Sequence, residues 1–571
     1  MSNNFLPNSP RVYLWVALGL LMFLNVEYWL KDYAPTPVPE ATPVAGSTTV
    51  PAANDLTQRL PAGAQSPAGA SPAPAVTPAA VPAAAAPAET AAAAPVVNVR
   101  TDVYDIDIST RGGTLARVDL PAYPQVKGEA APVRLENHDS PQTLYELQSG
   151  LTGPAGGAYP DQSALFTSAS ADYRMGSSAE LRVPLTWSAN GVTVTKTYMF
   201  KRGSYAISVQ YEVHNDGSAP WEVRPYAQIV RNDPRTKRSY FDVGSYAFHG
   251  PAIHDGTKYR PLDPTSRDSS QLSLDVRDGW LAALQHHFVS AIIPPRGEPW
   301  HFSLELAGDQ YQLAATGPLQ TVAPGASAQF PLTVFAGPKL QDQLDATAPE
   351  LDRVADYGKL WFLARPLYLL LAKVHALTGN WGIAIILVTF LLKLLFYPLS
   401  EASGRSMAKM KTLQPRIKNL QETYKDDREK LGRAMMELYQ REKINPVAGC
   451  LPIIIQIPVF IAFYWALLES VEMRQAPFAF WIHDLSSRDP LYILPAIMAV
   501  AMFVQYKLNP APPDPVQAKV FMVMPLAMSV MFAFFPAGLV LYWVTNTVLS
   551  IAQQWNINRR IETAAAAKRA N

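Results

Sequence analysis

Residues 381–399 read WGIAIILVTFLLKLLFYPL, a nearly continuous apolar run that contains one cation, Lys393. A helix needs roughly 20 apolar residues to span a bilayer, so this run predicts a transmembrane helix. An ammonium group at the centre of such a helix costs about 2.5 to 3.5 kcal/mol. Lys393 either snorkels to the headgroups at the near end of the helix or faces a polar cavity. Thr389, four residues earlier on the same helical face, favours the cavity.

Four further apolar segments follow, so the sequence predicts a block of five transmembrane helices over residues 380–555. Their limits are residues 450–468, 491–506, 520–535 and 537–552. Several hold only about 16 residues, and at about 1.5 Å per residue these fall short of a hydrocarbon core of about 30 Å. Local thinning of the bilayer is one way to absorb the mismatch. Pro536 begins a tight reversal, which predicts a helical hairpin from the last two segments.

Two of these segments carry amide side chains at a depth comparable to that of Lys393. Gln456 lies in the second segment, and Asn546 lies in the last, shortly after Tyr542 and Trp543. An amide that faces lipid leaves its hydrogen bonds unmade, so both are expected to face one another or a wet cavity. Ordinary bonding between helices explains the two amides equally well. Lys393 shifts the set toward a cavity.

The N-terminal part of the chain predicts an anchor followed by a tether. Residues 12–30 form another apolar run, with Arg11 before it and Lys31 after it. A cleaved signal peptide is the alternative, but no A-x-A-like site follows, so residues 1–33 are interpreted as a transmembrane anchor. Residues 34–96 are dominated by Ala, Pro, Thr and Ser, a composition that predicts a disordered linker.

Residues 97–340 have the texture of a β domain. Runs such as VTVTKTY at 192–198 and YAISVQY at 205–211 alternate with period two, which predicts half-buried strands separated by turn signals. These runs indicate a large antiparallel β-sandwich. Leucines then recur at helical spacing within residues 341–379, interrupted by Lys359, Arg365 and Lys373. One apolar stripe with several cations predicts an amphipathic helix that lies along the membrane surface.

The distribution of basic residues gives the orientation. The loop at 400–447 is rich in Lys and Arg and predicts two charged helices with a break near residues 425–427, whereas the loop after the next segment has only Arg474 and Arg488. The positive-inside rule therefore places the first loop in the cytoplasm. Six crossings then put the sandwich outside and both termini inside, including the basic tail at 556–571.

Composition and missing motifs exclude several classes of function. The formal net charge of +1 gives no signature of nucleic-acid binding. The sequence lacks a P-loop and any catalytic pairing within the apolar segments, so it predicts neither an enzyme nor a cofactor. The single cysteine, Cys450, builds neither a disulfide nor a thiolate metal site. His286 and His287 are expected to point to opposite faces of a strand, which disfavours a shared metal.

The helical block carries motifs that resemble those of the YidC family of bacterial membrane protein insertases. In the family's order and spacing they are SMAKM at 406–410, LQP at 413–415, NPVAGCLP at 445–452, QIPVF at 456–460, RQAPF at 474–478, WIHDL at 481–485 and FPAGLVLY at 535–542. Together they cover residues 356–555. The β domain is similar to the family's periplasmic domain, with STRGG at 109–113 and GLTG at 150–153 as weaker matches.

The resemblance implies a non-enzymatic insertase and chaperone in the bacterial inner membrane, with a galactose-mutarotase-like sandwich in the periplasm. A polar groove open to cytoplasm and lipid would hold one cation, here Lys393, that attracts acidic groups on an incoming chain. The best-known members have arginine at this position, and many have a second tyrosine where this chain has Trp543. The implied groove residues are Thr389, Lys393, Gln456, Tyr542, Trp543 and Asn546.

The resemblance also implies partners. They are nascent membrane proteins, the Sec translocon with its accessory subunits, membrane lipids, and the ribosome and signal-recognition machinery through the cytoplasmic loop and tail. Two other functions stay open at this stage. An anion or solute transporter or channel would use Lys393 to bind an anion in transit, and a sugar-processing ectodomain would leave the helical block unexplained.

Overall fold

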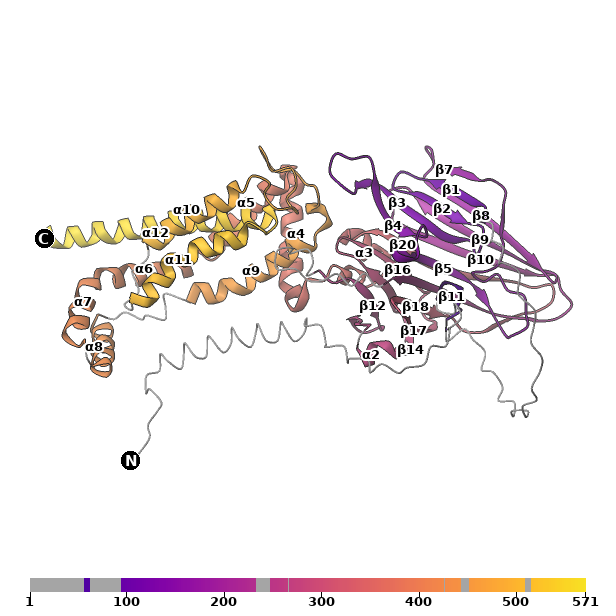
Figure 1. The fold of residues 1–571 in the computed structure, drawn as a ribbon, viewed down its shortest axis with the longest axis horizontal. Coiled ribbons are helices and arrows are strands. Elements are labelled where there is room, and N and C mark those ends of the chain that lie inside the picture. The colour runs from indigo at the N-terminus through magenta and orange to yellow at the C-terminus, as the bar shows by residue number, and fades with distance from the viewer. Residues whose placement is uncertain are drawn as a thin grey trace, which may run out of the picture.

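The structure, a computed structural model, describes residues 56–61, 94–232, 247–264, 266–425, 427–442, 451–508 and 515–570. The predicted anchor, most of the predicted linker and the 445–450 part of one family motif lie outside the described residues. A β-sandwich lies at one end of the molecule, next to a bundle of helices, and the helices α7 and α8 lie at the far end of that bundle (Figure 1).

The larger sheet of the sandwich has eleven strands. In spatial order they are β14 (Ser273–Arg277), β17 (Pro299–Ala307), β18 (Gln310–Thr316), β11 (Trp221–Asn232), β5 (Tyr145–Thr152), β4 (Pro132–Asn137), β3 (Thr114–Pro124), β2 (Asp105–Ser109), β1 (Val96–Arg100) and β7 (Asp172–Arg174), with β19 (Gln320–Val322) paired to β11. The pairing is antiparallel except between β1 and β7, which run parallel over three residues.

The smaller sheet has nine strands, all antiparallel. Their order is β13 (Tyr259–Pro261), β12 (Gly250–His254), β15 (Trp280–Leu284), β16 (Phe288–Ile293), β20 (Ser327–Pro338), β10 (Ala206–Asn215), β9 (Val192–Lys201), β8 (Glu180–Ala189) and β6 (Thr167–Ser168). Strands β9 and β10 alternate between buried and partly exposed residues, as their period-two pattern predicts. Three short helical turns complete the domain: η1 (Leu56–Gln58), η3 (Pro141–Thr143) and α2 (Arg267–Ser270).

A lysine side chain lies inside the sandwich core. Lys196 is fully buried, and its ammonium donates to the backbone oxygens of Gly112, Gly113 and Ser149 at 2.9 to 3.1 Å. The three donors of the ammonium are thereby all used. Gly112 has φ +67°, and a Cβ there would lie 2.8 Å from the backbone of Gln162. This packing explains why the STRGG motif needs a glycine at this position.

The segment predicted as one amphipathic helix is broken into four pieces. They are α3 (Gln341–Thr347), η5 (Leu351–Val354), η6 (Gly358–Leu360) and α4 (Trp361–Thr378). Helix α4 runs across the end of the bundle that faces the sandwich (Figure 1). It buries Ala364, Leu367 and Leu371 and packs against α5 and α9. Its polar side pairs Arg365 with Asp352 at 3.1 Å.

The rest of the chain is helical. The helices are α5 (Trp381–Leu395), α6 (Tyr397–Thr412), α7 (Gln414–Thr423), α8 (Arg428–Arg441), α9 (Leu451–Glu469), η8 (Val471–Met473), α10 (Ile493–Leu508), α11 (Pro515–Phe532) and α12 (Ala537–Ala570). No single described helix is both long and apolar enough to cross a membrane on its own, but α5 together with Tyr397–Ser406, bent by 65°, is. The predicted break in the charged loop lies between α7 and α8.

The reversal predicted at Pro536 joins the end of α11 to the start of α12, and both helices also pack against α10. The backbone amides of Ala537 and Gly538 bond the carbonyls of Ser487 and Leu485, which ties the start of α12 to a different loop. Most of the predicted basic tail at 556–571 continues α12, which ends at Ala570.

The sandwich docks on the bundle through polar contacts. Arg474 and Gln475, from the RQAPF motif, donate to the Pro124 carbonyl at the tip of the β3–β4 hairpin at 2.7 and 2.9 Å. Lys339, which follows β20, pairs with Glu469 at the end of α9 at 3.4 Å, and both side chains are only 1% exposed. The two parts of the described chain therefore share a structured interface.

Candidate functional site

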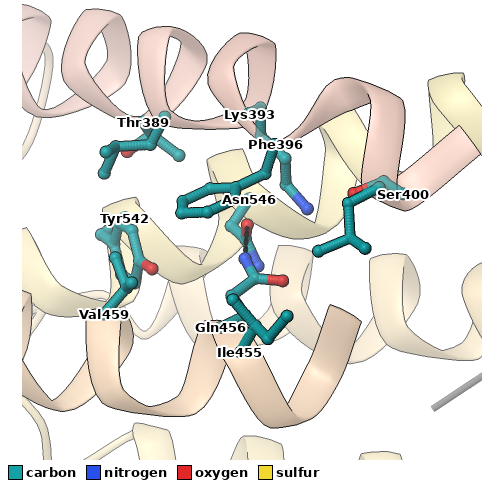
Figure 2. Close-up of a pocket in the computed structure, with 11 residues that line it drawn as sticks. Thr389, Lys393, Phe396, Ser400, Ile455, Gln456, Val459, Tyr542 and Asn546 are labelled. Atoms are coloured by element: carbon teal, nitrogen blue, oxygen red, sulfur yellow. Dashed lines mark hydrogen bonds between the residues drawn. The ribbon is translucent and has the colours of Figure 1, made fainter. Parts of the chain in front are cut away.

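A pocket lies where α5, α6, α9 and α12 meet, and its free volume of about 20 Å³ holds roughly one water molecule (Figure 2). Its lining residues are Thr389, Leu392, Lys393, Phe396, Leu399, Ser400, Ile455, Gln456, Val459, Tyr542 and Asn546. Five of the six residues predicted for the groove are therefore brought together. These five come from three helices that are separated in sequence, which supports the prediction of one polar site.

The fold positions Lys393 at the end of a broken helix. Asn380 caps the start of α5 by accepting a hydrogen bond from the Ile383 amide at 3.1 Å. Helix α5 ends at Leu395 with Phe396 as its C-cap, and Pro398 in the first turn of α6 lacks the N–H that would continue the ladder. Lys393 thus lies in the last turn of α5, where the helix dipole stabilises a cation.

The Lys393 side chain points into the space between the helices (Figure 2). Its ammonium donates to the Ser550 hydroxyl on α12 at 2.8 Å. Ser550 in turn donates to the Asn546 carbonyl at 2.8 Å, one turn earlier on α12. This inward bond favours the hypothesis that Lys393 faces a polar cavity over the hypothesis that it snorkels to the headgroups. The described lining contains no acidic side chain, so the pocket presents a cation without a counter-charge of its own.

The two amides predicted to face each other do so. Gln456 on α9 donates through its Nε2 to the Oδ1 of Asn546 on α12 at 2.8 Å (Figure 2). This bond satisfies part of both side chains and joins the two helices. The two amides therefore bond each other across the helices and also line the pocket.

The remaining predicted residues have different surroundings. Thr389 is 1% exposed, and its hydroxyl donates to the Ile385 carbonyl of its own helix at 2.6 Å. Tyr542 lines the pocket, with its ring against Phe460 and its hydroxyl toward the pocket interior (Figure 2). Trp543 does not line the pocket. Its ring packs edge-on against Phe460 at 4.1 Å between ring centroids.

Sequence reasoning missed Ser550, Ser400 and Phe396. Ser550 follows Asn546 by four residues, so helical spacing alone places both on one face of α12. Ser400 and Phe396 belong to the bend between α5 and α6. That bend carries these two residues into the lining, and it is not readable from an apolar run that continues through Leu399.

The histidine pair needs correction. His286 and His287 lie in the turn between β15 and β16, not within a strand, and their rings stack with centroids 3.8 Å apart. Burial lowers the pKa of His286 to about 3, so this ring is neutral. His286 contacts the Leu468 carbonyl at the end of α9. Across the described ranges, no three His, Cys, Asp or Glu side chains cluster as a metal site would require.

Comparisons with known proteins identify both halves of the chain. Residues 96–370 match the family model described as the YidC periplasmic domain, and residues 373–564 match the model of the 60Kd inner membrane protein. The Membrane protein insertase YidC of Nitrosococcus oceani is 44% identical over 560 residues, which covers 97% of this chain and 99% of that protein. That of Thioalkalivibrio sulfidiphilus is 44% identical and covers 98% and 99%.

Solved structures give weaker matches. An active YidC insertase crystal structure with the first transmembrane domain resolved is 18% identical, covering 81% of this chain and 94% of that chain, with a TM-score of 0.35. A galactose mutarotase-like protein from Lactobacillus casei is 11% identical, covering 42% and 99%, with a TM-score of 0.29. The family models and the full-length relatives carry the assignment: this chain belongs to the YidC family of membrane protein insertases.

Proposed function

We propose that this chain inserts nascent proteins into the bacterial inner membrane, and that Lys393 is the electrostatic receptor for acidic groups on the incoming chain. The observation that carries the proposal is the ammonium of Lys393, which lies in a pocket between α5, α6, α9 and α12 with a hydroxyl as its partner and no carboxylate in the described lining. A carboxylate on a substrate tail would supply the missing charge.

Lysine is chemically able to do this where relatives use arginine. An ammonium has three donors, and the bond to Ser550 uses one of them. Within the described part of the chain the other two donors have no partner, so they are available to a substrate carboxylate. A lysine gives a point charge in place of a bidentate fork, so it attracts carboxylates without fixing their orientation. Weak geometric selection suits a receptor that accepts many different tails.

The driving force for insertion is burial of the substrate's own apolar surface, at about 25 cal/mol per Å². Helices α9 and α11 support this by exposing apolar side chains that a new helix can slide along. These include Ile455, Ile457, Ile461, Val523, Leu526 and Val530. No nucleotide is needed in this mechanism, because the lipid replaces water around the new helix.

The arrangement in space supports the predicted orientation. The sandwich and the α7–α8 helices lie at opposite ends of the bundle (Figure 1), as a periplasmic domain and a cytoplasmic loop would. We infer six spans with both termini in the cytoplasm, on the basis of the basic residues in the 400–447 loop. In this orientation the cytoplasmic end of α12, with Arg559 and Arg560, and the α6–α8 loop would receive the ribosome and signal-recognition machinery, while the Sec translocon and its accessory subunits would engage the membrane and periplasmic parts.

The proposal is tested by exchanging charges between protein and substrate. Full-length protein is placed in liposomes with a single-span substrate whose short tail carries aspartates, and insertion is scored by protease protection. Lys393→Glu is expected to lower insertion about tenfold or more, because attraction becomes repulsion in a poorly screened site. Lys393→Arg should retain it within about twofold. Ser550→Ala is the matched control, because it keeps the charge and removes only the anchoring hydroxyl.

The reciprocal experiment uses a substrate with lysines in its tail. The Lys393→Glu protein should insert this substrate better than the unchanged protein does. Wild-type insertion of the aspartate substrate by Lys393→Glu would contradict the proposal. The same liposomes also report anion flux in the absence of substrate. The insertase names of the full-length relatives do not favour the transporter alternative, and no flux is expected.

A further inference from the structure

Six residues of the predicted linker are docked on the sandwich. Residues 56–61 lie on the outer face of the larger sheet, across β5, β11 and β18. Leu147, Ile229 and Leu313 of these strands point into the core, so their even-numbered neighbours point outward. Leu56 itself is 0% exposed and packs against Leu144, Val230 and Ala307. The expectation of a disordered linker therefore does not hold for these residues.

A row of glutamines crosses the three strands beneath this segment. Gln312 on β18 donates to Gln228 on β11 at 2.9 Å, and Gln228 donates to Gln148 on β5 at 2.7 Å. Gln148 completes the row by donating to Glu146 at 2.7 Å. Each glutamine amide has two N–H donors, and the row uses one donor of each.

The second donors are taken by backbone carbonyls of the docked segment. Gln312 and Gln228 both donate to the Arg59 carbonyl, at 2.9 and 3.1 Å. Gln148 donates to the Thr57 carbonyl at 3.3 Å. The three glutamines are 0 to 4% exposed with the segment in place, so the segment both shields them from water and supplies acceptors for their second N–H groups.

We propose that the outer face of β5, β11 and β18 is a peptide-binding site, and that residues 56–61 are its resident ligand in cis. The site recognises a short peptide by two features: one aliphatic side chain, which fills the pocket occupied by Leu56, and the backbone carbonyls that follow it. Because the contacts are to backbone, the glutamine row fits a range of sequences around the leucine anchor.

Binding is tested in trans with the full-length protein in nanodiscs. Residues 54–61 are replaced by Gly and Ser at equal length, and a fluorescent peptide of residues 54–63 is titrated by anisotropy. Saturable binding to the replaced chain is expected, at least about tenfold tighter than to the unchanged protein, whose site is occupied at a high effective concentration. Leu56→Ala in the peptide should weaken binding about tenfold or more. Gln228→Leu in the replaced chain should also weaken it, whereas Gln329→Leu, the same change at an exposed strand position, should not.

A second measurement does not depend on the replaced chain. With Cys450 changed to serine, Leu56→Cys and Gln58→Cys are labelled with a maleimide in the otherwise unchanged protein. The buried position 56 should react at least about tenfold more slowly than the exposed position 58. Adding Gln228→Leu should speed the reaction at position 56. Equal labelling rates at positions 56 and 58, or peptide binding that ignores both Leu56→Ala and Gln228→Leu, would overturn the proposal. Neither readout involves insertion, so both are independent of the proposed function.

Discussion

The ion pair between Lys339 and Glu469 gives a quantitative test of the junction between sandwich and bundle. Both side chains are 1% exposed, and the Lys339 ammonium lies 3.4 Å from Oε2 of Glu469. Lys339→Met keeps the apolar stem but leaves a buried carboxylate without its cation. Removal of one partner of a buried pair costs about 3 to 5 kcal/mol. For a domain of roughly 150 to 250 residues, that cost lowers the unfolding midpoint by roughly 6 to 20 °C.

The test is a double-mutant cycle on the full-length protein in detergent, with thermal unfolding midpoints for Lys339→Met, Glu469→Leu and the double variant. The double variant replaces the pair by apolar side chains, so it is expected to recover most of the loss. Arg182→Met is the control, because its pair with Glu180 is largely exposed and contributes about 0 to 1 kcal/mol. Single variants that shift the midpoint no more than this control, or a double variant with purely additive loss, would refute the reasoning.

Two further predictions concern the sandwich. Burial raises the pKa of Glu136 from its ordinary value of 4.5 to about 8. Between these two pH values the carboxyl of Glu136 is protonated in the folded protein and ionised in the unfolded chain. Stability contributed by this group is present at low pH and is lost as pH rises toward 8. Glu136→Gln should therefore raise the unfolding midpoint at pH 8.5 and change it little at pH 4, and an equal shift at both pH values would count against this assignment. Gly112→Ala should cost about 2 to 4 kcal/mol in a denaturant melt, because the φ of +67° and the backbone of Gln162 both oppose a Cβ. Gly203→Ala is the control, because Gly203 has φ +71° but open space around it. It should cost only about 1 kcal/mol, from the unfavourable backbone conformation alone. Equal costs for Gly112→Ala and Gly203→Ala would rule out the steric clash with Gln162.

The sequence predicts the elements of the sandwich better than it predicts their environment. Alternation places Lys196 on the same face as Val194 and Tyr198, which is the buried face of β9. The oxygens that make its burial possible come from Gly112, Gly113 and Ser149, far away in the chain. A pattern of period two reports which face a residue occupies, but the partner across the core depends on how the two sheets pack.

The same contrast holds for the candidate site, where helical spacing predicts which residues share a face but not all of their contacts. Helical spacing correctly relates Lys393 to Thr389, and the cost of burying amides correctly pairs Gln456 with Asn546. Trp543, one residue after Tyr542, points elsewhere because neighbouring residues of a helix face about 100° apart. The docking of residues 56–61 could not be predicted from the sequence for a different reason. The composition around Leu56 predicts disorder, and the glutamines that hold it lie on strands whose order in the sheet cannot be read from the chain.

The small size of the pocket sets a condition on the proposed function. Among the described residues its volume of about 20 Å³ is too small for a peptide tail, and the bond between Gln456 and Asn546 joins α9 to α12 across it. Under the proposed function, a substrate would separate these helices and replace that bond with its own polar groups. Such an exchange would be nearly balanced in hydrogen bonds, so the gain would come from neutralising Lys393 and from burying apolar surface along α9. A groove that opens only when both gains are available would select acidic tails followed by an apolar helix, which is the order of features in a short-tailed membrane protein.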